Sequence, residues 1–150
     1  MITIALASDH GGFELKEYIK SILDGYKILD LGTDSEVSVD YSDYGIKGGK
    51  AVASGKADMA ILVCGTGIGI SIAANKVCGV RAALCHNAEY AKLSREHNNA
   101  NVLALGGRFL SKVEAKEIVE VWLSTPFAGD RHQKRINKIK EYEECTNASH

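Results

Sequence analysis

The thiol of Cys64 lies between an apolar run and a short glycine-rich segment, and it is the first side chain in the sequence that suggests chemistry. Residues 59–63 form the apolar run, and Gly65, Gly67 and Gly69 alternate after the cysteine. Glycines let backbone N–H groups approach a bound oxyanion, and a helix that starts there adds partial positive charge. The spacing therefore predicts a thiol base or nucleophile beside an anion cradle, acting on a small anionic substrate.

Two further apolar runs end in residues that can do chemistry. Asp9 and His10 follow the first run, and Arg108 follows a later one. Ligands of an open parallel α/β sheet bind at the carboxyl ends of its strands, so these side chains are expected to meet the thiol at one edge. His97, at the end of a predicted helix and followed by Asn98, is expected at that same edge.

Apolar runs and helical patterns alternate along the chain. Strands are predicted over residues 2–7, 26–31, 59–63, 80–85 and 102–105. Helices are predicted over residues 13–23, 44–54, 70–76, 88–96, 112–123 and 131–144. Continuously apolar strands that alternate with helices are typical of a parallel sheet covered on both faces.

The predicted fold class is therefore α/β, as a doubly wound, Rossmann-like three-layer sandwich. It has a five-stranded parallel sheet and a C-terminal helix. Residues 1–144 are expected to form a single domain. Residues 145–150 carry no motif and are expected to form a disordered tail.

Composition narrows the classes of function. The chain has 150 residues, of which 45% are hydrophobic and 25% charged, with a net charge of −1. These values favour a globular domain and give no indication of a nucleic-acid partner or an anionic membrane surface. No apolar run approaches the roughly 20 residues of a membrane-spanning helix. The first residues lack the basic region of a signal peptide, so a cytoplasmic location is expected.

The cysteines are Cys64, Cys78, Cys85 and Cys145, and no two of them have C-x-x-C spacing. Free thiols are therefore expected rather than disulfides, and no metal site is predicted. Cys78 and Cys85 lie beside apolar residues, as structural cysteines do. Only Cys64 has neighbours that indicate a reactive role.

The last predicted helix is basic. Arg131 and Arg135 are four residues apart, so they share a helix face and can clamp a phosphate. The helix has few apolar positions, so it is either a solvated surface element or an arm that reaches a second subunit. A thiol, imidazoles and an arginine clamp without a cofactor motif favour a sugar-phosphate isomerase, which needs only a base and a stabilised enediolate.

These residues resemble those of a known family. Over essentially its whole length the chain is similar to ribose-5-phosphate isomerase type B, in the group that also contains galactose-6-phosphate isomerase subunits. The segments that carry the resemblance are 8–13, 40–41, 64–76, 94–98, 101–104 and 129–135. The resemblance implies interconversion of ribose 5-phosphate and ribulose 5-phosphate in the pentose phosphate pathway, with no cofactor. It also implies a homodimer, sometimes a tetramer, with active sites shared across the subunit interface.

The resemblance implies a role for each matching position. Cys64 is the base that moves the proton between C2 and C1, and Thr66 assists at the reacting oxygens. His97 opens the furanose ring with support from Asp9. The implied substrate-binding residues are Gly65, Thr66, Gly67, Ile68 and Gly69 in the anion hole, Asp9, His10, Tyr41 and Asn98 at the sugar, and His10, Arg108, Arg131 and Arg135 at the phosphate.

Three alternatives remain open. An isomerase of a six-carbon phosphate, such as allose 6-phosphate or galactose 6-phosphate, would use the same machinery. A non-catalytic nucleotide-binding module would use the glycine segment, but no acidic residue follows the first βα turn where a ribose partner is expected. A redox sensor would depend on Cys64 alone, which has no resolving cysteine near it in the sequence.

Overall fold

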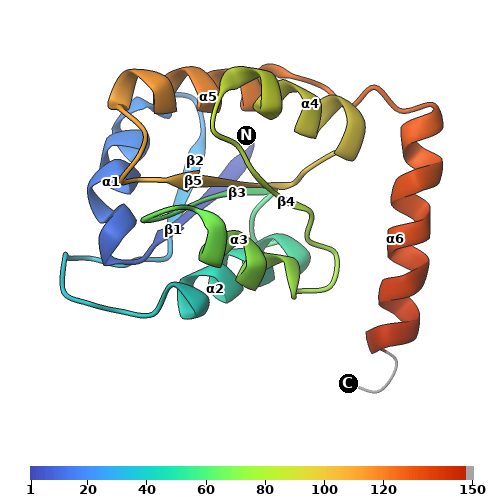
Figure 1. Cartoon of the computed structure of the whole chain (residues 1–150), viewed down its shortest axis with the longest axis horizontal. Helices are drawn as coiled ribbons and strands as arrows, with labels where there is room; N and C mark the ends of the chain where they lie inside the picture. Colours follow the sequence, from blue (N-terminus) through green and yellow to red (C-terminus); the bar gives the residue numbers. More distant parts are fainter. Residues whose placement is uncertain (148–150) are drawn as a thin grey trace.

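The computed structural model, which describes residues 1–147, contains a five-stranded sheet with the strand order β2-β1-β3-β5-β4 (Figure 1). All neighbouring strands are parallel. The strands are β1 (Thr3–Ser8), β2 (Lys27–Asp30), β3 (Met59–Cys64), β4 (Ala82–Leu84) and β5 (Val102–Gly106). The helices are η1 (His10–Gly12), α1 (Phe13–Ile22), α2 (Tyr41–Ala53), α3 (Ile68–Asn75), α4 (Ala88–Asn98), α5 (Lys112–Ser124) and α6 (Arg131–Asn147). Within residues 1–147, no helix is long and apolar enough to cross a bilayer.

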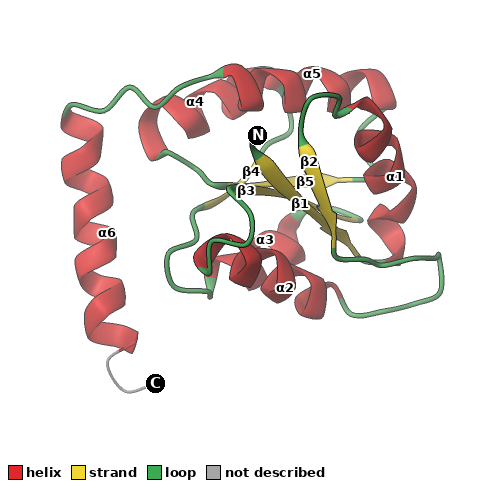
Figure 2. Cartoon of the chain, turned by 180° about the vertical axis from the view of Figure 1, so that it is seen from behind, coloured by secondary structure: helices red, strands yellow, loops and turns green. Residues whose placement is uncertain are grey.

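Helices cover both faces of the sheet, with α1, α4 and α5 on one side and α2 and α3 on the other (Figure 2). Along β1, Ile4 and Leu6 enter the core under the first group of helices, and Ala5 and Ala7 enter the core under the second. Both faces of the strand are therefore buried, which explains why the strands are continuously apolar in the sequence. The predicted doubly wound, three-layer architecture with five parallel strands is confirmed.

Helix α2 begins at Tyr41, three residues before its predicted start, because its first turn carries no apolar face that a periodic pattern could reveal. The helix lies unusually close to the sheet. A Cβ atom on Gly48 would come within 2.4 Å of Leu62 Cδ2, so only glycine permits this approach. The close packing brings the start of α2 beside α3.

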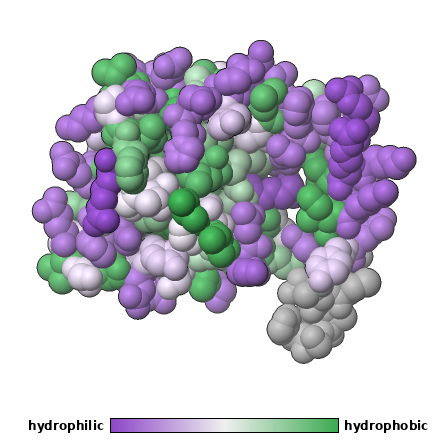
Figure 3. All heavy atoms as spheres, viewed as in Figure 1, coloured by the Kyte–Doolittle hydropathy of each residue, from purple (hydrophilic) through white to green (hydrophobic). Residues whose placement is uncertain are grey.

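Helix α6 stands beside the body of the protein (Figure 1). It contacts the body through its first turns and again through Glu143, whose Oε2 accepts the N–H of Gly79 at 3.1 Å. His132 and Ile136 are buried on its inner side, and most of its outer surface is hydrophilic (Figure 3). The helix continues to Asn147, so residues 145–147 of the predicted disordered tail are helical. This corrects the predicted boundary at 144. Residues 148–150 of that tail lie outside the described residues.

Candidate active site

The carboxyl ends of β1, β3 and β5 meet at one edge of the sheet. Ser8 pairs with Val63 in register, and Cys64 pairs with Gly106. Asp9 and His10 follow β1 directly, so the structure brings them to the edge where the thiol lies. Arg108 follows β5 by two residues and reaches the same place, as the sequence predicted.

The glycine segment surrounds the sulfur of Cys64, whose side chain is buried. The backbone N–H of Gly67 donates a hydrogen bond to Cys64 Sγ at 3.2 Å. Gly67 has φ +81°, and a Cβ atom there would come within 2.5 Å of Leu84 Cδ1. The turn therefore requires glycine, and it aims a backbone donor at the thiol while α3 begins at Ile68.

Thr66 lies exposed at the tip of this turn, where its Oγ1 accepts the N–H of Ile68 at 3.1 Å. Its hydroxyl hydrogen stays available to a ligand oxygen, because a hydroxyl both donates and accepts. The ring of Tyr41 lies over Gly69, where a Cβ atom would come within 2.5 Å of its Cε1. Tyr41 thereby closes one side of the glycine segment.

The guanidinium of Arg108 lies across two glycines of this edge. A Cβ atom on Gly65 would come within 3.0 Å of Arg108 Nη1, and one on Gly11 would come within 3.3 Å of Nη2. The backbone N–H of Arg108 also donates to the carbonyl of Gly65 at 3.0 Å. A fixed positive charge therefore lies directly beside the turn that carries the thiol, as an anion site requires.

Asp9 and His10 have fixed orientations. The buried carboxylate of Asp9 accepts the N–H of Gly12 at 3.1 Å. Nδ1 of His10 accepts the backbone N–H of Val39 at 3.2 Å. A nitrogen that accepts a hydrogen bond carries no proton, so neutral His10 holds its own proton on Nε2 and can donate it to a ligand.

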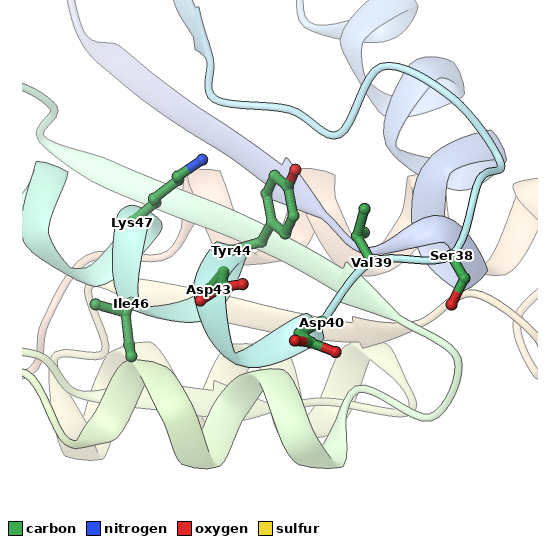
Figure 4. Close-up of a pocket in the computed structure, with 7 residues that line it drawn as sticks. All are labelled: Ser38, Val39, Asp40, Asp43, Tyr44, Ile46 and Lys47. Atoms are coloured by element: carbon green, nitrogen blue, oxygen red, sulfur yellow. The ribbon is translucent and has the colours of Figure 1, made fainter.

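A hollow of about 500 Å³ lies next to this edge, between the loop before α2 and the first turns of that helix (Figure 4). Its lining includes Val39, Asp40 and Tyr44, and Cys64 is not part of it. The hollow therefore lies near the edge of the sheet that carries the thiol, but the thiol does not line it. Among the described residues, no cluster of three His, Cys, Asp or Glu side chains is able to hold a metal ion.

His97 and Asn98 do not lie at this edge, which corrects the sequence-based expectation for His97. They end α4, next to the amino ends of the strands, where the carbonyl of Asn98 accepts Arg81 Nε at 3.1 Å. The nearby carbonyl of Asn101 accepts the N–H of Ala60, at the start of β3. Cys64 lies four residues further along that strand, about 13 Å away at a rise of about 3.3 Å per residue. A helix that follows a strand of a parallel sheet runs back, so its end must lie at the opposite edge.

The amino edge carries its own group of polar side chains. The ring of His97 stacks on that of His132, with centroids 4.4 Å apart and an angle of 15° between the planes. Arg131 and Arg135 flank His132 on α6, and both are exposed. The structure therefore divides the candidate residues into a group at the carboxyl edge and a group at the amino edge.

Sequence reasoning missed His132. Burial lowers the pKa of His132, and the neighbouring His97, Arg131 and Arg135 lower it further, while Asp130 acts in the opposite direction. The only available indication was its position between two selected arginines. Stacking on a side chain from another helix is not visible in a sequence.

A doubly wound parallel sheet with a thiol, a glycine turn and a guanidinium at its carboxyl edge is typical of an α/β enzyme that does acid–base chemistry on an anionic ligand. The profile of the Ribose/Galactose Isomerase family matches residues 4–139. The chain therefore belongs to this family.

Individual relatives are similar to this chain over nearly its whole length. Ribose-5-phosphate isomerase B of Escherichia coli is 46% identical over 149 residues, which cover 98% of this chain and 100% of that protein. The solved structure of Clostridium thermocellum ribose-5-phosphate isomerase B superposes with a TM-score of 0.96 at 50% identity, covering 97% of this chain and 100% of that one. The structure of a ribose 5-phosphate isomerase from Thermotoga maritima gives a TM-score of 0.91 at 53% identity, covering 93% and 98%.

Proposed function

We propose that this protein is an aldose–ketose isomerase that interconverts D-ribose 5-phosphate and D-ribulose 5-phosphate. The observation that carries the proposal is the hydrogen bond that Cys64 Sγ accepts from the backbone N–H of Gly67, in the glycine turn beside Arg108. The chain that carries this site belongs to the Ribose/Galactose Isomerase family. The reaction places the enzyme in the non-oxidative pentose phosphate pathway. Because this pathway operates in the cytoplasm, we assign the protein to that compartment.

The chemistry follows from the carboxyl-edge group. Cys64, as the thiolate, takes the proton from C2 of the open-chain aldose and returns it to C1, through an enediolate. The hydroxyl proton on O2 passes to O1 in the same sequence, with Thr66 assisting at the two oxygens. The negative charge that develops on the enediolate oxygens is stabilised by N–H groups of residues 65–69 and by the hydroxyl of Thr66. Asp9 and Tyr41 contact the sugar. No metal ion is needed, because hydrogen-bond donors supply the electrostatic stabilisation.

The amino-edge group supplies the remaining steps from a second copy of the chain. His97 opens the furanose ring by proton transfer, with support from Asp9, and Asn98 contacts the sugar. His97 and Asn98 cannot reach Cys64 of their own chain, because they lie at the amino ends of the strands and Cys64 lies at the carboxyl end of β3. A symmetric dimer that places the amino edge of one protomer over the carboxyl edge of the other would form two complete sites.

The phosphate would be held from both protomers. His10 and Arg108 approach it from the carboxyl edge, and Arg131 and Arg135 approach it from α6 of the second copy. Arginines four residues apart on a helix can each give two parallel hydrogen bonds to one phosphate. This assembly also accounts for the polar surface of α6, which then faces a ligand and a partner.

A six-carbon sugar phosphate is the second candidate substrate, because the matched family includes galactose isomerases. One additional carbon in a pocket changes the transition-state free energy by only about 1–3 kcal/mol, so the two substrate classes are expected to overlap. The values of kcat/KM for ribose 5-phosphate, allose 6-phosphate and galactose 6-phosphate would decide between them.

The proposal is tested by following the formation of ribulose 5-phosphate with the purified protein in the presence of a metal chelator. We expect conversion by the natural chain, and a fall in kcat of about 10³-fold or more in Cys64→Ala, because the base is lost. Cys78→Ala, which removes an exposed thiol in the loop between α3 and β4, is the matched control and is expected to keep kcat within about two-fold. Activity of folded Cys64→Ala close to that of the natural chain would rule out the thiol as the base.

A further inference from the structure

Lys16 is a lysine whose side chain is 1% exposed, on the face of α1 that packs against the sheet. Its Nζ lies 2.8 Å from Asp30 Oδ1 and 3.0 Å from Glu17 Oε2. A buried ion pair often stabilises a fold no better than apolar residues of similar size would. Here Lys16 is fully buried and Asp30 is 23% exposed, so the pair can have a role besides its contribution to stability.

The carboxylate of Asp30 also bonds the backbone of the chain that leaves the sheet. The N–H of Gly32 donates to Asp30 Oδ1 at 3.0 Å. The carbonyl of Gly32 accepts the N–H of Ser8 at 2.8 Å, and Thr33 donates to the Ser8 carbonyl at 3.0 Å. Asp30 thus helps to hold Gly32 and Thr33, where the segment 33–39 begins, beside Ser8, one residue before Asp9.

The other end of this segment contacts the candidate site. Val39 donates its N–H to His10 Nδ1 at 3.2 Å, whereas residues 36–38 between the two anchors are exposed. Figure 4 shows Ser38 and Val39 on the loop that leads into α2. The tautomer and direction of the His10 ring therefore depend on where this segment is held.

Partial burial raises the pKa of Asp30, but the hydrogen bonds from Lys16, Gly32 and Lys20 lower it to about 2. The carboxylate is therefore ionised throughout the physiological range. Its Oδ1 remains a permanent acceptor for Gly32 and Lys16 together.

We propose that the ion pair between the buried Lys16 and the partly buried Asp30 is a positioning device for His10. Through Gly32 and the segment 33–39 it holds the imidazole as the Nε2–H tautomer, directed toward the substrate phosphate. Lys16 and Asp30 are positioning residues, since neither touches the substrate. The inference rests on the proposed function for the identity of the ligand, although the tautomer itself can be read without any substrate.

The test uses the full chain with Lys16→Met and Asp30→Leu combined, which replaces both charges by apolar groups and so avoids an unpaired buried charge. The readouts are the ¹⁵N shifts of the His10 ring at neutral pH, assigned against His10→Gln, and steady-state kinetics with ribose 5-phosphate. We expect the single Nε2–H tautomer to become a mixture, and KM to rise about ten-fold with kcat within about two-fold. Lys20→Gln, which removes the exposed partner of the other Asp30 oxygen, is the matched control and is expected to change neither readout.

A second pair of variants tests the contact between Val39 and His10 without disturbing the Lys16–Asp30 pair. Val39→Pro removes the N–H that His10 accepts. Val37→Pro, at an exposed position of the same segment, removes instead the N–H that Ser35 Oγ accepts. Only Val39→Pro is expected to mix the tautomers and raise KM. An unchanged His10 tautomer in Val39→Pro, or in the folded double variant, would overturn the proposal. Absence of isomerase activity in the natural chain would instead overturn the proposed function, because the ¹⁵N readout needs no substrate.

Discussion

The imidazole rings of His97 and His132 lie parallel at 4.4 Å and join the last turn of α4 to the first turn of α6. Near the stack the carbonyl of Glu96 accepts the N–H of Ala128, which anchors the connection between α5 and α6. The contact fixes Arg131 relative to His97. The two rings and the arginines that flank His132 therefore form one preassembled unit at the amino edge of the sheet.

The stack makes stability depend on pH. Because burial and the positive neighbours lower the pKa of His132 in the folded protein, the unfolded chain binds a proton more readily below its ordinary value of 6.5. This contribution to the free energy of unfolding is therefore present above about pH 6.5 and is lost as the pH falls through the folded pKa. His132→Phe keeps an aromatic ring that can stack on His97 but removes the imidazole that binds the proton. Urea unfolding at about pH 8 and about pH 5 is expected to show a smaller acid loss in this variant.

The control is His86→Phe, at an exposed histidine after β4. It is expected to lose as much stability on acidification as the natural chain does. An acid loss in His132→Phe equal to that of the natural chain would show that the stack does not govern this pH dependence.

Subunit complementation tests the shared site directly. Cys64→Ala impairs the carboxyl-edge group, and His97→Ala impairs the amino-edge group, so each homodimer is expected to be inactive. In a heterodimer, one site carries both substitutions and the other carries neither. Random mixing produces heterodimers as half of all dimers, so activity is expected to return to about a quarter of the natural value. No recovery after mixing, with heterodimers verified by native mass spectrometry, would argue that each site comes from a single chain.

Gly67 is expected to be the least replaceable glycine of the turn. Gly55 has the same φ of +81° in an open position, so Gly55→Ala measures the cost of the backbone conformation alone, about 1 kcal/mol. Gly67→Ala adds overlap with Leu84 and the Leu105 backbone, which is expected to cost about 1–3 kcal/mol more. It also displaces the donor to Cys64, so kcat is expected to fall about 10²-fold or more. Equal losses of stability in the two variants, measured by urea unfolding, would contradict the close approach.

Asp30 is expected to contribute to stability until the solution becomes strongly acidic. Its pKa falls from 3.8 in the unfolded chain to about 2 in the folded protein. A lowered carboxyl pKa stabilises the fold above about pH 4, and that stabilisation disappears as the pH falls toward 2. Asp30→Asn is expected to unfold with a flatter pH dependence in this window. Asp24→Asn, at an exposed turn, is the control and is expected to keep the slope of the natural chain.

Much of the fold could be predicted because its determinants are local. The runs that became β1, β3 and β5 are buried on both faces, so their apolar character is continuous in the sequence. The start of α2 was wrong by three residues because its first turn is polar. The end of α6 was wrong because its last turns carry no apolar pattern that marks where a helix stops.

The candidate site was predictable only in part. Cys64, Asp9 and Arg108 follow strand ends, and the rule that carboxyl ends share an edge is enough to bring them together. His97 was assigned to the wrong edge, although the direction of a helix between parallel strands could have corrected it. The stacking of His132 was not predictable, because it joins two helices that the chain separates by the whole of β5 and α5.

The sequence by itself determined the order of strands and helices, the thiol and its glycine turn, since each depends on neighbours along the chain. Only the tertiary structure decided that the candidate residues form two groups on opposite edges of the sheet. The same holds for the Lys16–Asp30 pair and the Val39–His10 hydrogen bond, which join residues 14 and 29 positions apart. The physical reason is that side-chain contacts between distant segments depend on how close the packed helices and sheet bring them, and no periodic pattern encodes that distance.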